Sequence, residues 1–408
     1  MFRIFSHSFV VVAALLLLSG GTGALFVSAQ SRPQRPPETG GGNEKRNKRP
    51  DPSQKKEEIS PEDKAAIKDD EVLKIGTNLV NVDATVYQKK SGQIVTGLTK
   101  ENFAIFEDGV KREITNFSTP EAPITVTLVV EYSKLSAYLG RAVGGGFDPG
   151  TFEVVRPAAI FLQQFLKPPD DYASVIAFDI RPTPLTDFTN DPKRINDVVN
   201  LLVRNNPAFS ENNVFDAVKF ALVGGKADSV VLENSKERTQ VYGGMADVKA
   251  KRRAIILITS GIDTFSKINY DQVRKVIQQT GVPIYIIGTG NFFYKRYEPY
   301  LPATDSLTGA PGRLTFLQAD NTLKTFAKES GGAYYPVTFE SEVPNALRGI
   351  TALLRNQYSL AFEPDLTRVN NGKKHKLEVK VDVDKDGTYD DKVYVVQHRP
   401  FYIPNEKK

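Results

Sequence analysis

The chain has 408 residues, which is long enough for two domains and a sizeable hydrophobic core. With 40% hydrophobic residues, 25% charged residues and a net charge of +5, it has the composition of a soluble protein and points to no nucleic-acid partner. The absence of cysteine excludes disulfides, thiolate metal sites, a thiol nucleophile and a lipoprotein anchor. The three histidines, His7, His375 and His398, lie outside the central region, which excludes a Ser-His-Asp triad there.

Residues 1–29 are typical of a secretion signal. Arg3 precedes an apolar run at 9–18, and the small residue Ala29 predicts cleavage before Gln30. The alternative is an uncleaved anchor, because residues 9–27 could span a bilayer although "SGGTG" interrupts them. In both cases the rest of the chain is exported. Residues 30–71 are rich in Pro, Gly and mixed charge, which predicts a disordered linker.

The next segment, residues 72–122, predicts a small all-β module. Residues 79–88 alternate between apolar and polar side chains, as in a half-buried strand. A further short strand follows at 94–98. Residues 103–117 predict two strands that are joined at the Asp108-Gly109 turn.

Residues 123–357 predict an α/β domain. The continuous apolar runs at 124–130, 253–260 and 283–290 are typical of strands that are covered on both faces. Helical patterns occur at 152–166, 191–205, 213–222, 270–281, 321–332 and 343–357. The alternation of the two element types predicts a doubly wound, mainly parallel sheet. Residues 224–251 and 291–319 are expected to be long irregular segments.

Residues 358–408 return to strand patterns, at 358–364, 374–383 and 392–403, with turns at Asn371-Gly372 and Asp386-Gly387. We expect these strands to pair with residues 72–122. The α/β domain would then be inserted into one smaller all-β module.

Several segments agree in order and spacing with a known family. These are "VTGLTKENFAIFEDGVKREITNFS" at 95–118, "FTND" at 188–191, "VFDAV" at 214–218, "SGIDTFS" at 260–266 and "RNQYSLAFEP" at 355–364. The chain resembles a von Willebrand factor A domain and, more closely, secreted bacterial proteins related to that domain and best known from Acidobacteria. The resemblance covers nearly everything after Val72. It implies a role in protein binding or cell adhesion.

The resemblance also implies a metal-ion-dependent adhesion site, in which two aspartates and several hydroxyls hold Mg²⁺. The matching positions are altered in this chain: Glu131, Ser133, Leu135 with Ser136 one residue later, Asn212, and Ser260 with Asp263 three residues later. One carboxylate remains where the family has two. We therefore expect a vestigial site whose polar groups bond one another and serve as candidate partner contacts, with neither Mg²⁺ nor another cofactor. Metal-dependent adhesion through the altered site remains the alternative.

Two further motifs are each outweighed by a simpler interpretation. Asp382, Asp384 and Asp386 match positions 1, 3 and 5 of a calcium loop, but position 12 is Val393 and the flanks are strands. A solvated hairpin is favoured over a Ca²⁺ site. "IIGTGNFF" has Phe293 where a dinucleotide loop needs its third glycine, which favours a plain strand end.

Taken together, the sequence predicts an exported, non-enzymatic interaction or adhesion protein, secreted or held in the periplasm or cell envelope. A hydrolase that uses Asp216 and Asp263 is one alternative, although no phosphate loop, thiol or central histidine supports it. An envelope protein stabilised by Ca²⁺ is another. The expected partner is a protein, and no membrane span is expected after signal cleavage.

Overall fold

The computed structural model describes residues 79–134, 157–158, 161–162, 165–204, 207–226, 241–307, 311–365 and 372–404. Residues from Lys74 onward form one compact unit. The predicted signal at 1–29, the linker at 30–71 and Asn371 lie outside the described residues. Of the helix that we expect at 152–166, residues 157–158, 161–162 and 165 are described as helical, and residue 166 is described as lying outside a helix.

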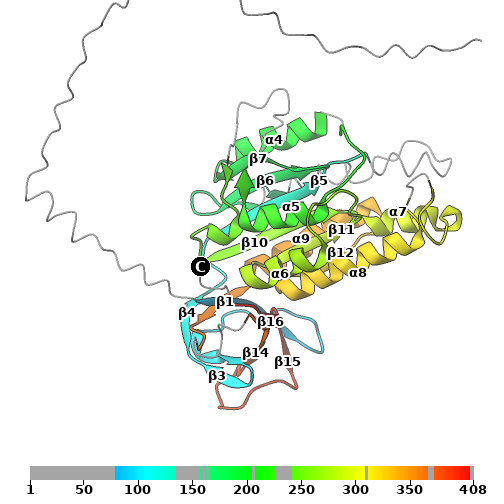
Figure 1. The fold of residues 1–408 in the computed structure, drawn as a ribbon. Coiled ribbons are helices and arrows are strands. Elements are labelled where there is room, and N and C mark those ends of the chain that lie inside the picture. Colours follow the sequence, from blue (N-terminus) through cyan, green and yellow to red (C-terminus); the bar gives the residue numbers. More distant parts are fainter. Residues whose placement is uncertain are drawn as a thin grey trace, which may run out of the picture. The chain divides into compact units, whose positions relative to one another are not determined.

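The centre of the α/β domain is a six-stranded sheet with the order β12-β11-β10-β5-β6-β7 (Figure 1). Its strands are β5 (Ile124–Glu131), β6 (Tyr172–Phe178), β7 (Pro182–Thr189), β10 (Arg252–Thr259), β11 (Ile284–Gly288) and β12 (Tyr334–Pro336). All neighbouring pairs are parallel except β6 and β7, which are antiparallel. The prediction of an α/β domain is therefore confirmed at the level of a mixed sheet with one antiparallel edge strand.

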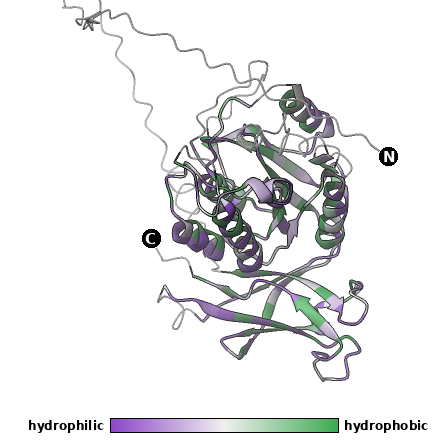
Figure 2. Ribbon diagram, turned by 90° about the vertical axis from the view of Figure 1, so that its right-hand side faces the viewer, coloured by the Kyte–Doolittle hydropathy of each residue, from purple (hydrophilic) through white to green (hydrophobic). Residues whose placement is uncertain are grey.

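Helices cover both faces of this sheet, as Figure 2 shows. The core on one face includes α4 (Pro192–Arg204) and α9 (Val343–Arg355). The core on the other face includes α5 (Val214–Val223), α6 (Tyr270–Thr280) and α8 (Arg313–Ser330). Alternate residues of β10 enter the two cores, which is why residues 254–258 are all apolar.

Two helix ends lie at the limits of the predicted helical patterns at 191–205 and 270–281. Asp191 accepts a hydrogen bond from the N–H of Lys193 at the start of α4, at 2.9 Å. Gly281 ends α6 in the left-handed conformation, with φ of 63°, which favours glycine.

The prediction that residues 291–319 are irregular is wrong. They contain α7 (Gly290–Tyr297), η3 (Glu298–Tyr300) and the start of α8 at Arg313. Phe293 and Tyr297 pack with Phe316 in a small separate cluster, so these helices bury their apolar residues away from the main sheet. In the segment 224–251, the described elements are β8 (Gly225–Lys226), β9 (Val241–Tyr242) and η2 (Met245–Asp247).

The flanking segments form two four-stranded antiparallel sheets, with the orders β15-β1-β13-β4 and β16-β14-β2-β3. We call them the β module. Its elements are β1 (Val80–Gln88), η1 (Lys100–Asn102), β2 (Phe103–Glu107), β3 (Val110–Arg112), β4 (Ile114–Ser118), β13 (Tyr358–Phe362), β14 (His375–Val381), β15 (Tyr394–Gln397) and β16 (Phe401–Tyr402). Strands from before and after the α/β domain thus pair with one another and share one core.

A buried arginine joins the two connections of the α/β domain. Arg252 is the first residue of β10 and is 1% exposed. Its guanidinium donates to the carbonyls of Pro120 and Ala122, which precede β5, and to the carbonyl of Leu354 near the end of α9. One side chain therefore holds the entry and the exit of the domain together.

Arg399 makes a second link between the β module and the α/β domain. It lies against Gly281 and Gly331, where a side-chain Cβ would collide with it, and donates to the carbonyl of Asn81 in β1. These glycines end α6 and α8, where a cation interacts favourably with the helix dipoles. Burial lowers the pKa of Arg399 to about 10.

His398, next to Arg399, should make stability depend on pH. Its Nδ1–H donates to the Arg399 carbonyl at 2.7 Å, and its Nε2 accepts from the N–H of Val379 at 3.3 Å. Burial lowers its pKa below the ordinary 6.5, while the Arg399 carbonyl and the Glu378 carboxylate partly oppose this shift. The unfolded chain therefore takes up the proton first.

We expect stability to be complete above about pH 6.5 and to fall by up to about 1.4 kcal/mol per pH unit below it. Urea unfolding between pH 7.5 and 5.5 measures this slope. The variant His398→Gln should flatten it, and an unchanged slope in that variant would contradict the assignment.

Candidate functional site

The polar positions at the carboxyl end of the sheet come together around one carboxylate. Glu131 is the last residue of β5, and Ser260 directly follows β10, the neighbouring parallel strand. Ser133 follows β5, and Asn212 precedes α5. This edge is opposite the one that Arg252 occupies, because Arg252 begins β10 and Ser260 follows its end.

The Glu131 carboxylate accepts five hydrogen bonds and is 1% exposed. Oε1 accepts from Asn212 Nδ2 at 2.8 Å and from Ser133 Oγ at 3.2 Å. Oε2 accepts from Thr259 Oγ1 at 2.7 Å, from the Ser260 N–H at 2.7 Å and from Ser260 Oγ at 2.8 Å. A carboxylate has about four lone-pair positions, so these donors occupy its capacity.

This arrangement gives a divalent ion few ligands. Mg²⁺ needs near-octahedral oxygen ligands, and both Glu131 oxygens are already used by internal donors. Asn212 Oδ1 is buried and, among the described residues, has no hydrogen-bond partner. It is the one feature of this cluster that would suit a cation.

Asp263, the candidate for a second carboxylate, bonds to groups outside the Glu131 cluster. Its Oδ1 accepts from Ser266 Oγ at 2.5 Å and from the N–H of Phe215 at 3.2 Å. Burial raises the pKa of Asp263, and the nearby charge of Asp216 adds to this, while the bonds from Ser266 and Phe215 oppose it. The carboxylate thus ties the loop after β10 to the start of α5.

Asp216 has a similar role, because it accepts from the N–H groups of Lys267 and Ile268 in that same loop. Neither carboxylate has a described contact with a histidine. Of the other predicted site positions, Leu135 and Ser136 lie outside the described residues.

Two exposed aromatic side chains flank this edge, and they were not among the predicted site residues. Phe209 is 42% exposed and its carbonyl accepts from the N–H of Lys134, directly after Ser133. Phe265 is 58% exposed and its N–H donates to the Asn212 carbonyl. The available signal was their position in loops, next to the matched polar residues.

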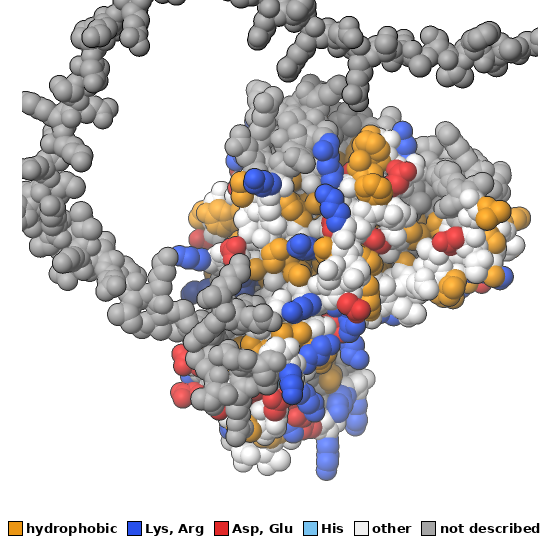
Figure 3. Space-filling model, viewed as in Figure 1, with side chains coloured by type: hydrophobic (Ala, Val, Ile, Leu, Met, Phe, Trp, Pro, Cys, Tyr) orange, Lys and Arg blue, Asp and Glu red, His pale blue; other side chains and the backbone are white. Residues whose placement is uncertain are grey.

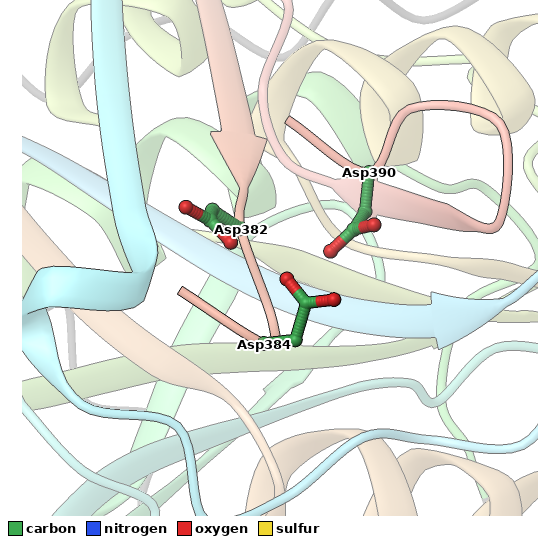
Figure 4. A group of neighbouring side chains, drawn as sticks. All are labelled: Asp382, Asp384 and Asp390. Carbon is green, nitrogen blue, oxygen red and sulfur yellow. The ribbon is translucent and has the colours of Figure 1, made fainter. Parts of the chain in front are cut away.

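The acidic hairpin between β14 and β15 holds a second group of carboxylates. Asp382, Asp384 and Asp390 have ligand atoms within 4.8 Å of one another, whereas Asp386 is outside this group (Figure 4). Sequence reasoning named Asp386 and missed Asp390. Among the described residues, this is the group of acidic side chains that could hold a metal ion.

Backbone N–H groups already contact these hairpin carboxylates. Gly387 donates to Asp382 Oδ2 at 2.9 Å, and Val383 donates to Asp390 Oδ2 at 2.8 Å. The same hydrogen bonds are expected in a solvent-exposed turn that binds no metal.

No family model matches the sequence, and the search of curated proteins found no match. Among solved structures, the chain is similar to proximal thread matrix protein 1 from the mussel byssus, with 11% identity over 61% of this chain and 50% of that one and a TM-score of 0.38. It is also similar to the vWF domain of the type V pili tip protein Mfa5 from Porphyromonas gingivalis, with 14% identity over 58% and 95% of the two chains and a TM-score of 0.35.

A third similar structure is the PilB minor pilin from Streptococcus sanguinis, with 12% identity over 57% and 61% of the chains and a TM-score of 0.37. The similarity thus spans half of the mussel chain and less than two thirds of the pilin. Among the described residues, no helix is long and apolar enough to cross a membrane.

Proposed function

We propose that this is an exported protein related to von Willebrand factor A domains, which binds a protein partner without a metal ion and without catalysis. The observation that carries the proposal is the Glu131 carboxylate, which accepts five internal hydrogen bonds at the position where the resemblance implies a metal ligand. Those bonds favour a structural role for Glu131 over metal binding.

The partner surface in this proposal is the carboxyl edge of the sheet. Glu131 is too buried to touch a partner, so the contact falls on the exposed side chains beside it. Phe209 and Phe265 supply large apolar area, which is the kind of side chain that contributes most to protein interfaces.

Export and the absence of catalysis rest on separate observations. The apolar run and the small residues within positions 1–29 support export to the periplasm, the cell envelope or the medium. The hydrogen bonds of Asp216 and Asp263 to the backbone and to Ser266 support a structural role, which leaves a hydrolase without its candidate groups.

Partner capture should depend on the two aromatic side chains. The double variant Phe209→Ser/Phe265→Ser should lose the proteins that the wild type retains from native envelope extract, in buffer containing EDTA. Loss of apolar contact area at an interface centre commonly costs about 2 kcal/mol or more per aromatic residue. Quantitative mass spectrometry of the retained proteins measures the loss.

Val395→Ser is the matched control, because Val395 is 46% exposed but lies in the β module. It should retain the same proteins as the wild type. Equal retention by the double variant, or a requirement for Mg²⁺ in the wild type, would contradict the proposed contact.

A metal-dependent version of the same function is the second candidate. The observation in its favour is the unpaired Asn212 Oδ1, an oxygen that could face a cation. The metal titration that ends the Discussion separates the two candidates.

A further inference from the structure

A pocket of about 410 Å³ lies next to the carboxyl edge of the sheet, between α6, α8 and the loop after β10. We call it the α6–α8 pocket. Phe215 and Tyr270 supply aromatic lining, and Asp263 supplies a carboxylate. Thr315, Gln318 and Thr325 line it from α8, where their spacing puts them on one helix face. Figures 1 and 3 view the unit from the side of α6 and α8.

The charge of this lining is negative. Asp263 is its carboxylate, and no lysine, arginine or histidine is among the described residues that line it. On α6, the Arg274 guanidinium lies over the Tyr270 ring, 5.1 Å from its centroid, and is paired with Glu329. A second carboxylate, Asp216, is close enough to act on Asp263 electrostatically.

Two hydroxyl groups of the lining already donate to groups within the protein. The Thr315 hydroxyl donates to Asp305 Oδ1 at 2.5 Å, and the Thr325 hydroxyl donates to the Asn321 carbonyl at 2.8 Å. Both hydroxyl oxygens can therefore only accept from a ligand. Asp263 Oδ1 accepts from Ser266 Oγ and from the N–H of Phe215, and the Ser266 backbone also bonds this carboxylate.

We infer that the α6–α8 pocket takes a lysine or arginine side chain of the protein partner, with its charged end at Asp263. Phe215 and Tyr270 would pack against the aliphatic stem. Ammonium and guanidinium groups donate hydrogen bonds only, which matches the Asp263 carboxylate and the hydroxyl oxygens of Thr315 and Thr325. An acidic side chain would be repelled, and a neutral sugar would leave the carboxylate without a counter-charge.

This inference rests on the proposed function. It places a positive group of the partner at this edge, whereas a metal-dependent site would take a negative one. A metal ion at this edge would recruit a carboxylate from the partner. Without the metal, the negative groups at the edge include the half-buried Asp263 and the exposed Glu211, which favour a basic partner group.

The test uses four probes with the full-length protein: acetyl-Gly-Lys-Gly-amide, acetyl-Gly-Arg-Gly-amide, the corresponding Glu peptide and maltotriose. Calorimetry at low salt should show that the two basic peptides bind with Kd on the order of 1 mM. The Glu peptide and the sugar should show no heat of binding.

Asp263→Asn keeps the Oδ1 acceptor and removes the charge, and should weaken both basic peptides at least tenfold. Gln318→Lys places a cation in the pocket and should abolish their binding while leaving the loop after β10 unchanged. Asp271→Asn is the control, because Asp271 is an exposed carboxylate on α6 that does not line the pocket. It should bind like the wild type.

Binding of maltotriose or the Glu peptide, or unchanged binding of the basic peptides by Gln318→Lys, would overturn the inference. If the peptides fail to bind while Phe209→Ser/Phe265→Ser still loses the partner, the pocket assignment alone is wrong. If the peptides bind but the double variant keeps its partner, the proposed contact surface is wrong.

Discussion

Glu131→Gln should lower the free energy of unfolding by about 2–4 kcal/mol in the absence of divalent metal, because it removes the charge to which five buried donors point. The new side chain also has an NH2 group in place of one carboxylate oxygen. This group is itself a donor and would face donors that now bond Glu131. Either the Asn212 amide or the Thr259 and Ser260 hydroxyls would then lose their acceptor.

A metal ligand would behave in the opposite way. In an empty metal site, a carboxylate without a cation is a desolvation cost, so its neutralisation leaves stability unchanged or raises it. Urea unfolding in EDTA at pH 7 distinguishes the two cases. Glu211→Gln, an exposed carboxylate at the same edge, is the control and should change stability by less than about 0.5 kcal/mol.

The second large effect is expected at Arg252. Arg252→Ala should cost about 3–4 kcal/mol, because the carbonyls of Pro120, Ala122 and Leu354 lose their donor and the buried stem leaves a cavity. Since these carbonyls belong to the entry and exit of the α/β domain, the loss acts on both connections at once.

Arg253→Ala provides the comparison for this variant. Arg253 is the next residue in β10, but it donates to the carbonyls of Met245 and Ala246 within the α/β domain. It should cost about half as much or less, as judged from chemical unfolding monitored by circular dichroism. If the two variants lose the same free energy of unfolding, the bonds of Arg252 to the two connections contribute no more than the bonds of Arg253 within the domain.

The fold could be predicted from the sequence where apolar pattern and packing coincide. The strands at 124–130 and 253–260 are buried on both faces, so their uninterrupted apolar runs were a sufficient signal. The helix α6 has a capping Asn269 and a closing Gly281, which mark its ends in the sequence as clearly as in the structure.

The prediction failed where helices bury only a small separate cluster. Leu314 and Leu317 are each 49% exposed in the first turns of α8, so apolar residues there occur on more than one face and obscure the buried stripe of Phe316, Ala319 and Leu323. Near the C-terminus, the predicted strand at 392–403 is interrupted between β15 and β16. Arg399 turns there toward the ends of α6 and α8, a long-range contact that no local pattern indicates.

The matched polar positions could be located from the sequence, but their bonding could not. The order of segments placed Glu131, Asn212 and Ser260 near one another. The sequence could not indicate that Thr259, which was not among the predicted residues, donates to the same carboxylate, or that Asp263 points to other partners. Which donors reach Glu131, and which groups Asp263 contacts, depends on the direction in which each side chain points, and the sequence does not specify that direction.

The most direct test of a metal-independent site is calorimetric titration with Mg²⁺ and Mn²⁺. All titrations use protein that also carries Asp382→Asn, so that metal binding at the acidic hairpin does not add to the signal. As a positive control, the variant Glu131→Asp/Leu135→Ser/Asn212→Thr/Ser260→Asp introduces the ligand set that the resemblance implies and should gain one site. We expect no binding at millimolar metal with native residues at these four positions. A saturable isotherm that Glu131→Ala abolishes would contradict the account and would restore metal-dependent adhesion as the mechanism.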